Sequence, residues 1–108
     1  MKINIKPLSV NEAWQGRRFK TKKYLAFEQE FLLKLRPLKL PEPPYSVYYE
    51  FGLSNVLSDW DNSIKVTQDC LQKKYNFNDK DIFEGLVRKV KVDKGSEYIL
   101  FEIKTFLK

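Results

Sequence analysis

The chain contains no histidine and only one cysteine among its 108 residues. Without histidine it has neither the base of a Ser-His-Asp or Cys-His catalytic site nor the mixed ligand set of a Cys/His zinc site. Cys70 has no partner for a disulfide within the chain, which fits a reducing compartment. Because it lies among apolar residues of an expected helix, we interpret Cys70 as part of the core.

The sequence also lacks a hydrophobic run long enough to cross a bilayer. Its first residues alternate between apolar and polar like a strand and show no apolar signal segment. We therefore expect a cytoplasmic protein with no membrane partner. A length of 108 residues with 43% hydrophobic residues is typical of one domain with a modest core, here spanning residues 1–108.

The spacing of apolar residues predicts alternating strands and helices. Steps of three and four residues predict two helices, at residues 24–35 and 62–75, and Pro37 stops the first. Alternation and β-branched or aromatic content predict four strands, at residues 2–6, 45–51, 85–93 and 97–106. The last two strands are expected to form a hairpin, and residues 11–22 an irregular loop.

The net charge of +6 comes entirely from the first 23 residues. They hold seven basic residues against Glu12 alone, whereas residues 24–108 hold 13 of each sign. Most of these basic residues gather in residues 15–23, here named the basic arm, with Phe19 inside it: Arg17, Arg18, Lys20, Lys22 and Lys23. Such a segment is typical of contacts with nucleic-acid phosphates and bases. A solvated, solubilising face is the competing interpretation.

Five aspartates lie within the 23 positions from 59 to 81. On an extended segment, residues i and i+2 point the same way, so Asp59 and Asp61 would project together, as would Asp79 and Asp81. If the turn after residue 75 folds one pair against the other, the carboxylates converge. Two carboxylates about 4 Å apart repel by roughly 4 kcal/mol at an effective dielectric of about 20, so such a cluster needs a cation. Hard oxygen ligands favour Mg²⁺ or Mn²⁺.

The pattern Asp59-x-Asp61-Asn62-x-x-Lys65-x-x-x-Asp69-x-Leu71, followed by Asp79 and Asp81, resembles the RusA family of Holliday junction resolvases. The segment before the basic arm, Leu8-Ser9-Val10-Asn11, is similar to that family's N-terminal segment, and the likeness spans nearly the whole chain. The resemblance implies an α+β fold: a small mixed β-sheet of about four strands with two helices, in the order β-α-β-α-β-β. It also implies a homodimer that uses Mg²⁺ to resolve four-way, branched DNA junctions in recombination and repair.

The same resemblance assigns roles to individual residues. Asp59, Asp61 and either Asp81 or Asp79 match the metal-binding aspartates, with Asp81 preferred as the third ligand. Lys65 matches the active-site lysine, and the basic arm together with Asn11 is expected to bind DNA. The chain departs from the family pattern where Ser58 replaces a basic residue and where Lys80 splits an acidic pair that is usually adjacent.

Each motif has a simpler interpretation. Asp59 could cap the helix that follows, and Asp79 could serve a turn. Lys65 could form i,i+4 ion pairs with Asp61 and Asp69. Asp69 lies two helical turns from Asp61, so we expect it to be structural or to fix Lys65.

Two non-catalytic classes of protein compete with the nuclease interpretation. A nucleic-acid-binding module would use the basic arm and residues 88–91, and it would bind without Mg²⁺. A protein-interaction domain would pair through the aromatic strand at residues 45–51, and it would show neither cleavage nor salt-sensitive DNA affinity.

Overall fold

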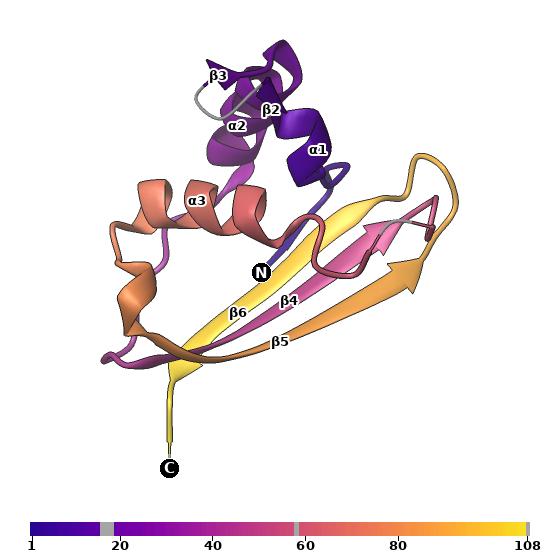
Figure 1. Cartoon of the computed structure of the whole chain (residues 1–108). Coiled ribbons are helices and arrows are strands. Elements are labelled where there is room, and N and C mark those ends of the chain that lie inside the picture. The colour runs from indigo at the N-terminus through magenta and orange to yellow at the C-terminus, as the bar shows by residue number, and fades with distance from the viewer. Residues whose placement is uncertain (16–18, 58, 108) are drawn as a thin grey trace.

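A four-stranded mixed sheet with helices on one face forms the body of the protein (Figure 1). The computed structural model describes residues 1–15, 19–57 and 59–107. The sheet has the order β1–β6–β4–β5, with β1 (Lys2–Ile3), β4 (Tyr45–Leu53), β5 (Ile82–Lys91) and β6 (Tyr98–Thr105). The helices are α1 (Val10–Ala13), α2 (Lys22–Lys34) and α3 (Ile64–Tyr75). This arrangement confirms the expected mixed α and β fold, and the element order matches the expectation apart from short added elements between β1 and α2 and before β5.

The central strand β4 shows why one face of the sheet is covered. Its alternate residues Tyr45, Val47, Tyr49 and Phe51 are buried, and they pack with buried residues of β6, α2 and α3. Strand alternation places these side chains on one face, and burying them against the helices removes their apolar area from water. Cys70 is fully buried in α3, as the sequence predicted.

Recognisable signals mark both ends of α2 and the C-terminal end of α3. Thr21 caps α2, because its hydroxyl accepts a hydrogen bond from the Tyr24 N–H at 3.1 Å. Leu35 forms the C-terminal cap two residues before Pro37. α3 ends at Asn76, which adopts the left-handed conformation at φ 55° and donates its N–H to the Gln72 carbonyl.

The predicted hairpin between the last two strands is wrong. β4 lies between β5 and β6, pairing parallel with β5 and antiparallel with β6. α3 carries the chain from the end of β4 back to the start of β5, and such a helical crossover produces a parallel neighbour. The alternation of side chains defined each strand and its faces, but it carried no information on which strands are neighbours.

The expected irregular loop at residues 11–22 contains short regular elements. α1 is followed by β2 (Trp14–Gln15) and β3 (Phe19–Lys20), which pair antiparallel. The Thr21 hydroxyl donates to the Glu12 carbonyl at 2.6 Å, and the Thr21 N–H donates to the Ala13 carbonyl. These bonds tie the start of α2 to α1. Among the described residues, no helix is long and apolar enough to span a membrane.

Candidate functional site

Asp59 and Asp61 lie in an exposed turn directly before α3. The Asn62 N–H donates to the Asp59 carbonyl at 3.1 Å, and the Ile64 N–H donates to the Asp61 carbonyl at 3.2 Å. Both aspartates are exposed. The segment is therefore a turn, not the extended stretch that the i,i+2 argument assumed. Ser63, not Asp59, occupies the N-cap position of α3, and it makes no side-chain cap bond.

Lys65 lies in the first turn of α3, close in sequence to these aspartates. Its ammonium is 3.6 Å from the Asp69 carboxylate, and its side chain is 63% exposed. Within the described residues, Asp61 makes no ion pair with Lys65. An exposed i,i+4 pair of this kind contributes only a few tenths of a kcal/mol. Asp69 thus contacts Lys65, as expected, while the ammonium stays open to solvent.

Asp79 and Asp81 lie at the opposite end of α3, in the 3₁₀ turn η1 (Asp79–Asp81). α3 has 12 residues, so it separates the two acidic pairs by about 18 Å of helix. The strand pairing leads to the same conclusion. Ile82, the residue after Asp81, pairs with the first residue of β4, whereas Asp59 follows the other end of β4. The convergence of both pairs within one chain, which the sequence suggested, is therefore wrong.

The described residues do not provide a metal site with three protein ligands. Among them, no three acidic or thiol side chains cluster so that they could hold an ion. A single chain therefore does not provide a site with three carboxylates. The Asp59 and Asp61 pair alone fits a weaker mode, because Mg²⁺ is often held by one or two carboxylates together with waters and substrate phosphates. Asn78, whose side chain accepts from the Lys80 N–H, stabilises the turn around Asp79.

The basic arm is partly described. Gly16, Arg17 and Arg18 lie outside the described residues, so the DNA contacts expected of the two arginines are not placed. Phe19 in β3 is 71% exposed, whereas Trp14 packs edge-on against Tyr24 with ring centroids 5.3 Å apart. Of these two aromatics, Phe19 is the one that can contact a base.

Two of the arm's lysines already have acidic partners. Lys20 is 3.2 Å from Glu28 and Lys23 is 3.3 Å from Glu12. Burial acts to raise the pKa of Glu28, but hydrogen bonds from Lys73 and Lys20 outweigh it and lower that pKa. Lys22 is exposed and makes no ion pair within the described part of the chain. Asn11 is exposed on α1, close in sequence to the arm.

The short helix α1 connects the basic arm to the Asp59–Asp61 turn. The Val10 N–H at the start of α1 donates to the Asn62 carbonyl at 2.8 Å, and Thr21 joins α1 to the start of α2. Figure 1 shows α1 between the β2–β3 pair and the start of α3. The Asp59–Asp61 turn, Lys65 and the basic arm, which α1 joins, are here together named the α3 N-terminal surface.

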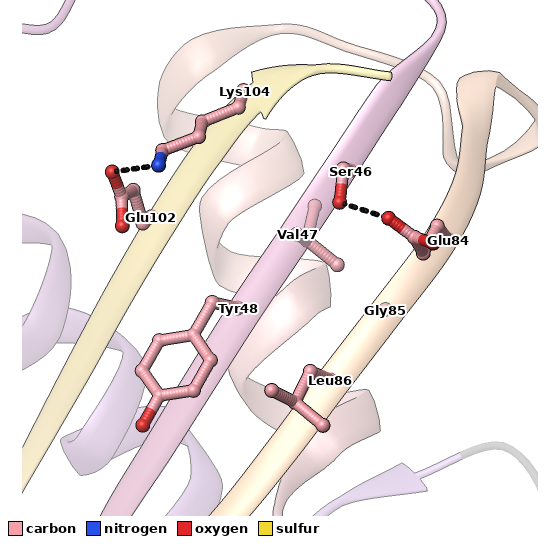
Figure 2. Close-up of a pocket in the computed structure, with 8 residues that line it drawn as sticks. All are labelled: Ser46, Val47, Tyr48, Glu84, Gly85, Leu86, Glu102 and Lys104. Atoms are coloured by element: carbon pink, nitrogen blue, oxygen red, sulfur yellow. Dashed lines mark hydrogen bonds and ion pairs between the residues drawn. The ribbon is translucent and has the colours of Figure 1, made fainter. Parts of the chain in front are cut away.

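A separate groove lies on the opposite face of the sheet, away from α3 (Figure 2). Its volume is about 540 Å³, and its lining includes Tyr48, Glu84, Leu86 and Glu102. No residue predicted from the sequence to belong to the site lines it. The groove therefore does not belong to the α3 N-terminal surface.

Next to this groove, sequence reasoning missed a cluster around Glu50. The hydroxyls of Tyr48 and Tyr98 both donate to the Glu50 carboxylate. These hydrogen bonds lower the pKa of Glu50 and raise that of Tyr98 to about 12. The signal was present in the alternation of β4, which places Tyr48 and Glu50 on the face opposite the buried residues.

Comparisons with known proteins add no assignment. A scan against protein-family models found no matching family, and a search of curated proteins found no match. The resemblance to the RusA family therefore depends on the residue patterns of the sequence alone.

Proposed function

We propose that this chain is a metal-dependent endodeoxyribonuclease that acts on branched DNA, as its resemblance to the RusA family suggests. The observation that supports the proposal best is the α3 N-terminal surface. It combines an exposed carboxylate pair, an exposed lysine one helical turn later and, after α1, a basic arm; α1 is hydrogen-bonded both to the turn, through Val10, and to the arm, through Thr21. Carboxylates alone would repel DNA, so a nuclease needs such cations beside its acidic residues.

The residues of this surface take separate roles in phosphodiester hydrolysis. Asp59 and Asp61 would hold Mg²⁺ or Mn²⁺, which when bound polarises the scissile phosphate and lowers the pKa of a water molecule. The Lys65 ammonium stabilises negative charge that grows on the phosphate oxygens, and Asp69 keeps it oriented. Lys22 binds the DNA backbone, and Phe19 stacks on an unpaired base near the branch point.

Asp81, the preferred third ligand, can join Asp59 and Asp61 only if a second chain supplies it. Within one chain α3 holds them apart. The homodimer implied by the resemblance provides the second chain, and two-fold symmetry would create two equivalent sites. Two sites suit the two symmetric cuts that resolution of a four-way junction requires.

The first experiment incubates the purified protein with a labelled four-way junction, with and without Mg²⁺. We expect cleavage by the wild type, and no cleavage but unchanged junction binding by Asp61→Asn. Lys65→Gln should still bind the junction but should cleave it far more slowly. Glu102→Gln is the matched control, because it removes an exposed carboxylate from the opposite face of the sheet. Cleavage by Asp61→Asn at the wild-type rate would refute the site.

A mixing experiment tests whether the site is shared between chains. Asp61→Asn and Asp81→Asn are each expected to be inactive. A mixed dimer would carry one site with both substitutions and one intact site, so the mixture should nick a single strand of the junction. An inactive mixture with both variants folded and dimeric would exclude a site built from two chains.

The separation of the acidic pairs favours one second candidate, a nucleic-acid-binding module without catalysis. In that case the basic arm binds DNA in the absence of Mg²⁺, and the wild type cuts no junction. The third class, an interaction domain that pairs through residues 45–51, is disfavoured by the fold. Both edges of β4 are already occupied by β5 and β6, so it has no free edge to offer a partner.

A further inference from the structure

The sheet ends on one side in a long open edge. β5 forms this edge with ten residues and no proline, whereas the other edge, β1, has only two. An edge strand leaves a row of backbone N–H and C=O groups free to pair with another chain. Soluble proteins usually shorten such an edge, interrupt it with proline or cover it. Among the described residues, no element covers the outer side of β5.

The side chains of β5 are unusual for an exposed edge. Leu86 near its centre is 61% exposed, and Phe83 near its start is 65% exposed. Leu86 lies on the open face of the sheet beside Tyr48 and is flanked there by Glu84 and Arg88 (Figure 2 shows Leu86 and Glu84). Exposed apolar residues on an unpaired edge strand are typical of a strand that pairs with a second chain.

The charges of β5 are complementary to those of a second, antiparallel copy. If a two-fold axis passes through Leu86, Glu84 lies opposite the partner's Arg88, and Arg88 lies opposite the partner's Glu84. Leu86 then faces the partner's Leu86 on the same side of the sheet. An in-register parallel pairing would instead place like charges opposite each other. Arg88 lies opposite Glu50 of β4, whose pKa it helps to lower, and within the described residues it makes no ion pair.

We propose that two copies of this chain join through β5, edge to edge and antiparallel about Leu86, and extend the two four-stranded sheets into one continuous sheet. The interface is isologous, since the same strand serves both chains. This inference concerns how the chains assemble and does not rest on the nuclease assignment. The axis also places the start of one β5, just after Asp81, beside the end of the partner's β5.

Charge reversal followed by charge exchange tests the register. The wild type should sediment as a dimer. Glu84→Arg and Arg88→Glu should each raise the dimer dissociation constant by about tenfold, because two attractive cross-strand pairs become repulsive. The double variant exchanges the charges and should return to within about threefold of the wild type, since the two sites are coupled. Glu102→Arg, on the same face but on the interior strand β6, should leave the constant unchanged.

A cysteine on the axis provides a second, independent measurement. Directly opposed residues in antiparallel strands have Cα atoms about 4.5–5.5 Å apart, which suits a disulfide. Leu86→Cys should therefore form a covalent dimer on oxidation, whereas Glu102→Cys should not. Cys70 is fully buried and does not contribute. A monomeric wild type, a double variant weaker than both single variants, or a Leu86→Cys protein that stays monomeric under oxidation would each overturn the proposal.

Discussion

Gly52 in β4 is a site where adding one carbon atom should destabilise the protein strongly. A Cβ atom placed there would lie 2.4 Å from two ring carbons of Tyr98. Two non-bonded carbon atoms cannot approach each other that closely, so the Tyr98 ring must move in the Gly52→Ala variant. The ring is only 8% exposed, and it carries the hydroxyl that donates to Glu50. The Lys2 ammonium also lies 4.4 Å above its centroid.

The expected loss follows from these contacts. A hydrogen bond to a charged group contributes about 1.5–3 kcal/mol, and a cation over an exposed ring about 0.5–1 kcal/mol. The apolar area of the ring that becomes exposed to water adds roughly 1 kcal/mol to this loss, at about 25 cal/mol per Å². These contributions add up to about 3–5 kcal/mol, so we expect Gly52→Ala to lower the free energy of unfolding by at least about 3 kcal/mol. For a chain of 108 residues this corresponds to a Tm lower by about 13 °C.

Urea denaturation followed by circular dichroism measures this change, and Gly85→Ala is the matched control. A Cβ at Gly85 would have a Val47 methyl carbon as its nearest atom, at 3.4 Å, which is an ordinary contact. The free energy of unfolding of Gly85→Ala should therefore differ from that of the wild type by less than about 0.5 kcal/mol. If Gly52→Ala were as stable as Gly85→Ala, the close packing of Tyr98 over β4 and the reasoning from it would be refuted.

Three further predictions concern the rest of the molecule. Hydrogen bonds from Tyr48 and Tyr98 lower the pKa of Glu50, so the stability that the Glu50 carboxylate contributes is present above its unfolded pKa and is lost as pH falls through its folded pKa. The difference in unfolding free energy between wild type and Glu50→Gln should therefore shrink on acidification. A difference that stays constant with pH would contradict this prediction. Thr21→Ala removes the cap of α2 and should lower the free energy of unfolding, measured by thermal denaturation, by about 1 kcal/mol. Thr21→Ser keeps the hydroxyl and should retain most of that free energy. Equal losses in the two variants would argue against the cap. Lys22→Gln should reduce the slope of log K against log salt for junction binding by about 0.9, whereas Lys39→Gln, remote from the basic arm, should leave the slope unchanged.

Local patterns in the sequence determined the elements and their buried faces. The three- and four-residue steps at residues 24–35 and 62–75 correspond to α2 and α3, and the aromatic run at 45–51 corresponds to β4. Helix and strand periodicities depend only on neighbouring residues, so they can be recognised without the rest of the fold. For the same reason the burial of Cys70 followed from its apolar neighbours in the expected helix.

The tertiary structure alone decided how these elements meet. The crossover through α3 makes β5 a parallel neighbour of β4 and sends the two acidic pairs to opposite ends of one helix. The bond from Val10 to Asn62 holds the start of α1 against the turn that contains Asp59 and Asp61, although the two bonded residues are more than fifty positions apart in the sequence. Strand order and contacts between distant segments depend on how the whole chain buries its apolar surface, and no local pattern encodes that choice.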